Sequence, residues 1–121
     1  MIVSVVIPCR NEVIYIEECI DAIYKNEIQN DLVLHVFVVD GMSDDGTREK
    51  VNQLQSRYPS LSLIDNKKQL TPFAFNLGIH ASKADFIQIV GARHILSSNY
   101  IQKALDVLAT KPDVWCVGGK L

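Results

Sequence analysis

The fold is decided by residues 37–47, which read Phe-Val-Val-Asp-Gly-Met-Ser-Asp-Asp-Gly-Thr. An apolar, β-branched run stops at the carboxylate of Asp40, and a loop rich in glycine and aspartate leads into a charged segment with helical spacing. This order predicts a strand, a loop and a helix, with Asp40 at the carboxyl end of the strand. Ligands of open α/β sheets bind at that edge, because the loops diverge there and leave a crevice between strand ends and helix N-termini.

Length and composition allow a single domain over residues 1–121 and exclude several protein classes. With 48% hydrophobic and 21% charged residues, the chain can bury a core and is not disordered. A net charge of -2 gives no general attraction to nucleic acid. Three cysteines without metal-type spacing favour reduced, mostly buried thiols. No stretch approaches the ~20 apolar residues of a membrane span, and no signal peptide is recognisable, so we expect a cytoplasmic chain.

Strands alternate with helices along the whole chain. Apolar, β-branched runs predict strands at about residues 2–7, 32–39, 61–64, 86–90 and 114–117. Apolar residues at helical spacing predict helices at about residues 12–26, 47–57, 71–82 and 97–112. This alternation is typical of an α/β fold, in which a mostly parallel sheet carries helices on both faces.

Polar side chains are expected to cap the helices. Asn11 precedes the first helix, and Ser97 or Ser98 precedes the last one, so each suits an N-cap position. Thr71 followed by Pro72 is a strong start signal for the third helix, because proline at the first helical position loses no hydrogen bond. These signals predict where the helices begin.

Three predicted strand ends place polar residues on one edge of the sheet. They are Pro8-Cys9-Arg10-Asn11-Glu12, Asp40, and Gly91-Ala92-Arg93-His94. A carboxylate there can accept hydrogen bonds from a base or a ribose, and helix N-termini favour phosphate. The combination predicts a nucleotide-type ligand in one cleft between the loops that carry Glu12 and Asp40. Asp40 could instead form an Asx turn that stabilises its own loop, and this second interpretation stays open.

Three ordered segments resemble the start of a family-2 glycosyltransferase of the GT-A type. They are residues 3–12 (Val-Ser-Val-Val-Ile-Pro-Cys-Arg-Asn-Glu), 38–47 (Val-Val-Asp-Gly-Met-Ser-Asp-Asp-Gly-Thr) and 75–81 (Phe-Asn-Leu-Gly-Ile-His-Ala). The likeness is greatest to bacterial polysaccharide and succinoglycan-type enzymes. It implies a Rossmann-like GT-A sheet and an inverting hexosyl transfer from a nucleoside diphosphate donor, usually a UDP-sugar. The implied acceptor is a glycan or a lipid-linked sugar.

The resemblance also assigns roles to individual residues. Pro8, Arg10 and Glu12 would line the nucleoside pocket, and Asp40 would meet the uracil or its ribose. In the family, the general base and the acceptor-binding segments come from later in the domain. We therefore expect no catalytic residue in this chain, which would form the inactive N-terminal, donor-binding part of a longer protein. Surface left uncovered by the missing part is expected to favour self-association.

One part of the family pattern is replaced. The Asp-x-Asp motif that holds Mg²⁺ or Mn²⁺ against the donor diphosphate falls on Gly91-Ala92-Arg93, which offers no carboxylate. A hard cation needs oxygen ligands, so the sequence does not support the usual metal site. Arg93 is predicted to supply positive charge instead, with His94 as a further donor. The alternative is a degenerate site in a non-catalytic nucleotide-binding or interaction module.

Overall fold

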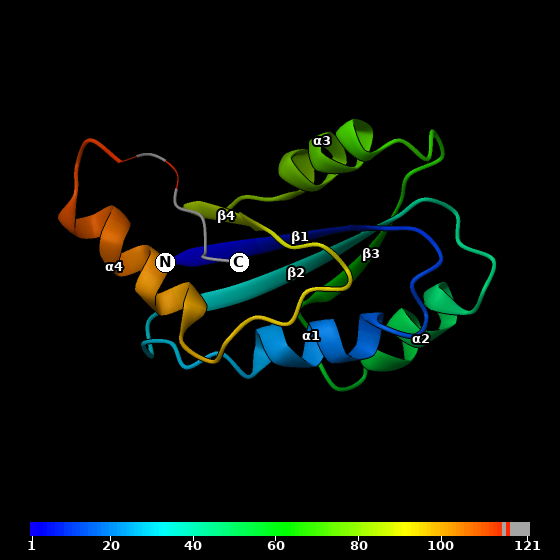
Figure 1. The fold of residues 1–121 in the computed structure, drawn as a ribbon, viewed down its shortest axis with the longest axis horizontal. Coiled ribbons are helices and arrows are strands. Elements are labelled where there is room, and N and C mark those ends of the chain that lie inside the picture. Colours follow the sequence, from blue (N-terminus) through cyan, green and yellow to red (C-terminus); the bar gives the residue numbers. More distant parts are fainter. Residues whose placement is uncertain (115, 117–121) are drawn as a thin grey trace.

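The computed structural model describes residues 1–114 and 116, which form a four-stranded parallel sheet with helices on both faces (Figure 1). The elements follow one another as β1 (Ile2–Cys9), α1 (Ile16–Tyr24), β2 (Val33–Asp40), α2 (Thr47–Leu54), β3 (Leu61–Asp65), α3 (Thr71–Ala81), β4 (Phe86–Ile89) and α4 (Tyr100–Thr110). The strand order is β3-β2-β1-β4. The α/β fold predicted from the alternation of strands and helices is confirmed.

The strand register aligns the carboxyl ends of the three strands that lead to the candidate site. Cys9 pairs with Asp40 across β1 and β2, and Asp40 pairs with Asp65 across β2 and β3. Parallel pairing brings these ends to the same edge, since all strands run in one direction. The loops that follow β1, β2 and β3 therefore start side by side.

The two faces of the sheet bury different amounts of apolar surface. On one face, α1 and α2 pack over the main hydrophobic core, in which Val5 and Ile20 are fully buried (Figure 1). On the other face, α3 covers a smaller cluster of Val6, Val39 and Ala74. Most α3 side chains remain exposed, so this helix contributes less to the core than α1 does.

Gly78 lets α3 lie close to the sheet. A Cβ atom at this position would stand 2.4 Å from one methyl carbon of Val6 and 2.9 Å from the other. Real side chains do not approach that closely, so only glycine permits this helix–strand distance. Gly78 therefore packs α3 against the sheet, whereas Asn76 of the same helix is exposed.

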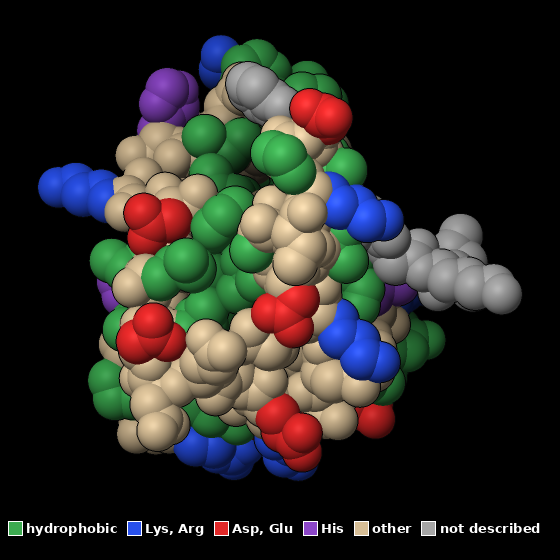
Figure 2. Space-filling model, turned by 90° about the vertical axis from the view of Figure 1, so that its left-hand side faces the viewer, with side chains coloured by type: hydrophobic (Ala, Val, Ile, Leu, Met, Phe, Trp, Pro, Cys, Tyr) green, Lys and Arg blue, Asp and Glu red, His purple; other side chains and the backbone are tan. Residues whose placement is uncertain are grey.

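The helix α4 and the strand β4 enclose an apolar groove of about 840 Å³ at one end of the molecule. Figure 2 views that end and shows hydrophobic side chains gathered near its middle. Among the described residues, β4 pairs only with β1, so its outer edge carries no neighbouring strand. Ile87 and Ile89 of β4 are 41% and 43% exposed, which is unusual for strand isoleucines.

The first helix begins later than the sequence predicts. It starts at Ile16 instead of Glu12, and its N-cap position is Tyr15, which makes no side-chain capping bond. The expected cap, Asn11, has a positive φ of 53°. Its side-chain oxygen accepts a hydrogen bond from the backbone N–H of Asp44 at 2.9 Å. Asn11 therefore joins two loops and is not available to cap the helix.

The caps predicted for the third and fourth helices are also wrong in detail. Thr71 is the first residue of α3, and Leu70 holds the N-cap position without a side-chain bond. Asn99, and neither Ser97 nor Ser98, holds the N-cap position of α4. The four predicted strands within the described residues agree with the structure to within two residues at each end.

Two further expectations concern the ends of the chain and the membrane. Residues 115 and 117 of the fifth strand predicted at 114–117 lie outside the described residues, so this strand stays a prediction. Within the described part of the chain, no helix combines the length and the apolar character needed to cross a membrane.

Candidate functional site

The chain topology creates a crevice next to β1. From β1 the chain moves outward to β2 and β3, and then crosses back through α3 to place β4 on the other side of β1. Ligands of open α/β sheets bind at the carboxyl edge near such a reversal of strand order, because successive loops diverge there. A cleft of about 320 Å³ lies at this edge, lined by Pro8, Cys9, Arg10, Glu12, Gly41, Asn66, Gln69, Leu70, Thr71, Ala74 and Ala92.

The structure brings three of the predicted nucleotide-site residues into this cleft. Pro8, Arg10 and Glu12 all line it, together with the start of α3. Asp40 and His94 are not among the lining residues, and Arg93 follows directly after the lining residue Ala92. The cleft thus lies between the β1 loop and α3.

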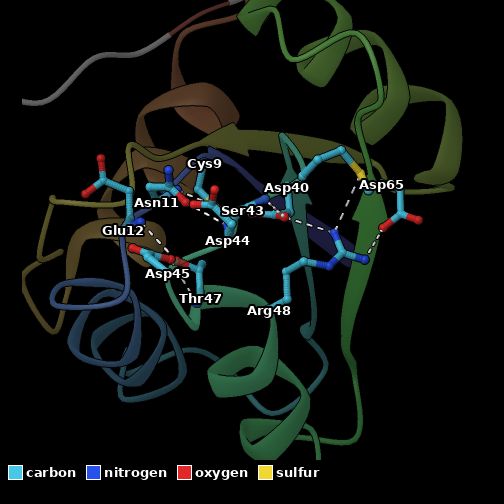
Figure 3. Close-up of polar contacts among 11 residues, drawn as sticks. Cys9, Asn11, Glu12, Asp40, Ser43, Asp44, Asp45, Thr47, Arg48 and Asp65 are labelled. Atoms are coloured by element: carbon cyan, nitrogen blue, oxygen red, sulfur yellow. Dashed lines mark hydrogen bonds and ion pairs between the residues drawn. The ribbon is translucent and has the colours of Figure 1, made fainter.

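The loops after β1 and β2 are bonded to each other, which corrects the expectation that they face each other across a cleft (Figure 3). The backbone N–H of Gly41 donates to the carbonyl of Cys9 at 2.8 Å. The N–H of Asn11 donates to the hydroxyl of Ser43, and the N–H of Glu12 donates to the hydroxyl of Thr47. Hydroxyl and carboxylate groups of the second loop satisfy the backbone of the first, so the two loops form one rigid wall.

Asp40 is fully buried, and its carboxylate is occupied by protein donors. It accepts hydrogen bonds from the backbone N–H and hydroxyl of Ser43, from the guanidinium of Arg48 at 2.9 Å, and from the thiol of Cys9. Burial alone would raise the pKa of Asp40, but the bonds from Ser43 and Arg48 outweigh it and lower that pKa. Asp40 therefore holds its loop as an Asx turn, and its carboxylate has no free face toward the cleft.

Arg48 joins the ends of two strands. Its guanidinium donates to Asp40 at the end of β2 and to Asp65 at the end of β3 (Figure 3). The planar fork of arginine suits this bridging position, since it can serve two carboxylates at once. These bonds raise the pKa of Arg48 above its ordinary value, with Asp65 as the larger cause, so it stays charged.

Cys9 lies in the cleft but is a poor nucleophile. Its thiol donates to Asp40 at 3.4 Å. Burial, followed by the negative charge of Asp40, raises the pKa of Cys9 far above that of an ordinary thiol. The neutral thiol is therefore a structural donor at this position.

Arg93 lies at the rim of the cleft, where Glu12 and Tyr15 hold it. Its Nε donates to the Glu12 carboxylate at 2.9 Å and 3.3 Å. Its guanidinium carbon lies 4.9 Å from the centre of the Tyr15 ring, which is a cation–π distance. The hydrogen bond to Glu12 raises the pKa of Arg93, so the guanidinium stays charged.

The predicted residue His94 lies in the turn that follows β4. Its backbone N–H donates to the carbonyl of Gly91 at 3.0 Å, and its ring lies close to Gly91. The side chain is exposed. It does not line the cleft, so a role for His94 as a donor to a ligand there stays a prediction.

The residues at this edge do not fit a divalent metal ion. Nowhere in residues 1–114 and 116 do three or more histidine, cysteine, aspartate or glutamate side chains gather closely enough to hold a metal ion. Glu12 is the one acidic residue among those that line the cleft, and Arg93 already occupies its oxygens. The residues of this edge therefore support no chemical step through a metal ion.

Asn66 is a cleft residue that the sequence did not single out. Its side chain is 3% exposed, and its Oδ1 has no hydrogen-bond partner in the described structure. Its Nδ2 donates to the carbonyl of Leu70, and its backbone N–H donates to the carbonyl of Asp40 at 2.8 Å. An unpaired buried acceptor costs about 1–3 kcal/mol. The only signal in the sequence was its place two residues after the third predicted strand.

Comparison with known sequences agrees with the geometry. The family model described as Glycosyl transferase family 2 matches residues 4–120. The succinoglycan biosynthesis protein ExoA of Rhizobium meliloti is 30% identical over 112 residues, which cover 90% of this chain and 33% of ExoA. Glycosyltransferase AglE of Haloferax volcanii is 37% identical over 108 residues, which cover 88% of this chain and 35% of AglE. The chain spans about a third of the length of these relatives.

Solved structures show the same architecture. The mannosyltransferase PcManGT of Pyrobaculum calidifontis, solved with GDP-Man and Mn²⁺, superposes with a TM-score of 0.82 at 29% identity. The match covers 88% of this chain and 32% of PcManGT. TarS 1–349 of S. aureus superposes with a TM-score of 0.80 at 20% identity, over 91% of this chain and 33% of TarS 1–349, and shows the fold alone. With a family match over nearly its whole length and this GT-A sheet, the chain belongs to glycosyltransferase family 2.

Proposed function

We propose that the full-length protein transfers a sugar, with inversion, from a UDP-linked donor to a glycan or lipid-linked acceptor. This chain would form the donor-binding half. The observation that carries the proposal is the cleft beside β1, which gathers Pro8, Arg10 and Glu12 at the carboxyl edge of the sheet in a member of this family. The structural relative PcManGT was solved with a nucleotide-sugar, GDP-Man, which supports this ligand class.

The walls of the cleft suit a nucleoside. Pro8, Leu70 and Ala74 supply apolar surface for a flat ring. Asn66 also lines the cleft, and its buried Oδ1, which has no partner among the described residues, would accept a hydrogen bond from a base N–H, a ribose hydroxyl or a water molecule that reached it. Asp40 would serve this pocket indirectly, because its carbonyl holds the backbone of Asn66. Arg10, which is exposed at the cleft, adds positive charge for the diphosphate.

The competing proposal is a non-catalytic nucleotide-binding or interaction module. The Arg93–Glu12 ion pair favours it, because each group already neutralises the other. Under both proposals we expect the 121-residue chain by itself to leave donor and acceptor unchanged, since it spans about a third of the length of its relatives. A glycosyl transfer assay on the full-length protein separates the two, because only an enzyme would release UDP in the presence of an acceptor.

Calorimetric titration of the chain with UDP and with GDP tests the binding step. We expect UDP to bind in the cleft and R10A to weaken that binding, because the variant removes a cation from the cleft wall. R57A is the matched control, since Arg57 is an exposed arginine that pairs with Asp21 on α1. If neither nucleotide binds at millimolar concentration, with or without Mn²⁺, the proposed function is wrong.

A further inference from the structure

Glu12 is unavailable to a metal ion in this structure. It is the one acidic residue lining the cleft, and its two oxygens lie 2.9 Å and 3.3 Å from the Nε of Arg93. A divalent cation at this place would have to displace a guanidinium from its carboxylate and would still find a single acidic ligand. Mg²⁺ and Mn²⁺ sites in proteins are built from several oxygen ligands, so the cleft does not offer one.

Arg93 is held at the same rim in a defined orientation. The guanidinium lies against the ring of Tyr15, 4.9 Å from its centre, while its Nε is bound by Glu12. Both contacts use the Nε side and one face of the group. In the part of the chain that the structure describes, no hydrogen bond is formed by the two Nη nitrogens, although 66% of the side chain is exposed. The fork that suits phosphate oxygens is therefore open.

A guanidinium and a divalent cation can both neutralise the negative charge of a diphosphate. Both place positive charge where the donor diphosphate gains negative charge as the sugar leaves. Arginine does so through directed N–H groups that match phosphate geometry, and it remains charged without any coordination shell. Glu12 and Tyr15 would reduce the freedom that such a long side chain loses on binding.

We propose that Arg93 binds the diphosphate of the nucleotide donor in place of a divalent metal ion, with Glu12 and Tyr15 as positioning residues. This inference rests on the proposed function, because it assumes that a nucleoside diphosphate occupies the cleft. It deepens that function by making donor binding independent of metal. The structural relative PcManGT, by contrast, was solved in complex with both GDP-Man and Mn²⁺.

The test is calorimetric titration of the chain with UDP in EDTA and in Mn²⁺, with uridine binding followed by NMR. Wild type should bind UDP equally in both buffers. R93A should lower the affinity for UDP about tenfold or more and leave that for uridine unchanged, because only the phosphate contact is lost. The affinity of R93K for UDP should lie between those of wild type and R93A, since lysine keeps the positive charge but lacks the planar fork of arginine. R57A should behave as wild type.

The positioning role of Tyr15 has its own readout. Y15L should weaken UDP binding and leave uridine binding unchanged, whereas Y15F, which keeps the aromatic face, should restore wild-type affinity. UDP binding that requires Mn²⁺, or that R93A leaves unchanged, overturns the inference while the proposed function stands. If UDP and GDP both fail to bind in either buffer, the inference falls together with the proposed function.

Discussion

Arg48 donates to the buried carboxylate of Asp40 at 2.9 Å and thereby holds the loop that closes one side of the candidate site. The ion pair spans the end of β2 and the first turn of α2. Because Asp40 is fully buried, its charge depends on this guanidinium and on Ser43 for compensation. The two residues thus give the loop its shape and make it sensitive to loss of either charge.

Acid should weaken the fold through Asp40. The pKa of Asp40 is lower in the folded chain than in the unfolded one, so its contribution is complete above a pH of about 3.9 and is lost as pH falls through the lower folded value. At pH 7, D40N should reduce the free energy of unfolding by about 1–3 kcal/mol. Urea denaturation should show a smaller difference between wild type and D40N at pH 3. The exposed residue Asp44 provides the control, D44N; an equal loss there would contradict the prediction.

Removal of Arg48 should be costly for the same reason. R48M leaves the buried carboxylate of Asp40 without its cation, and we expect a loss of about 1.5–3 kcal/mol in the free energy of unfolding, measured by urea denaturation. The matched variant R57M removes an exposed ion pair with Asp21 and should leave the denaturation midpoint nearly unchanged. Similar denaturation midpoints for R48M and R57M would show that the Arg48–Asp40 pair stabilises the fold no more than an exposed ion pair does.

Gly78 should tolerate no side chain while Val6 is present. G78A places a methyl group 2.4 Å from Val6 and should destabilise the chain by about 1–3 kcal/mol, despite the better helix propensity of alanine. The same change in a V6A background should cost much less, because the clashing methyl groups are gone. Thermal unfolding of wild type, V6A, G78A and the double variant measures the coupling free energy between positions 6 and 78. Additive effects would contradict close packing of α3 on β1.

The open edge of β4 should promote self-association of the 121-residue chain. Ile87 and Ile89 are exposed beside an edge that no described strand covers. We expect light scattering to show oligomers at high concentration and I87K to reduce them. The control I14K changes an isoleucine that is 80% exposed in the turn before α1, and it should have little effect. A clean wild-type monomer at high concentration would refute the prediction.

Thiol reactivity should follow burial. Cys116 is exposed, whereas Cys19 is buried and its surroundings raise the pKa of its thiol to about 12. Cys9 is half-buried, and burial and Asp40 raise its pKa further. Iodoacetamide at pH 8 should therefore label Cys116 first in the folded chain, because the thiolate is the reactive form. Mass spectrometry of digested samples measures the order; early labelling of Cys9 would show that its thiol is more acidic than the structure indicates.

Local signals in the sequence predicted which helices and strands form better than they predicted the residues at which the helices begin. The strand ending at Asp40 and the helices around Ile20 and Val51 appear as expected, because apolar periodicity reports burial directly. The predicted cap at Asn11 failed because its amide bonds to Asp44, far away in the sequence. Capping depends on which backbone N–H lies nearest to the side-chain oxygen, and for Asn11 this is the N–H of Asp44 in the next loop.

By itself, the sequence determined the alternation of strands and helices, the parallel sheet and the family, since these follow from periodicity and motif order. Only the tertiary structure decided which polar groups face the cleft. It turned Asp40 toward Ser43 and Arg48, and it placed the unsuspected Asn66 at the cleft. A buried polar group takes whichever donors and acceptors the fold brings within reach, and that choice is made by residues distant along the chain.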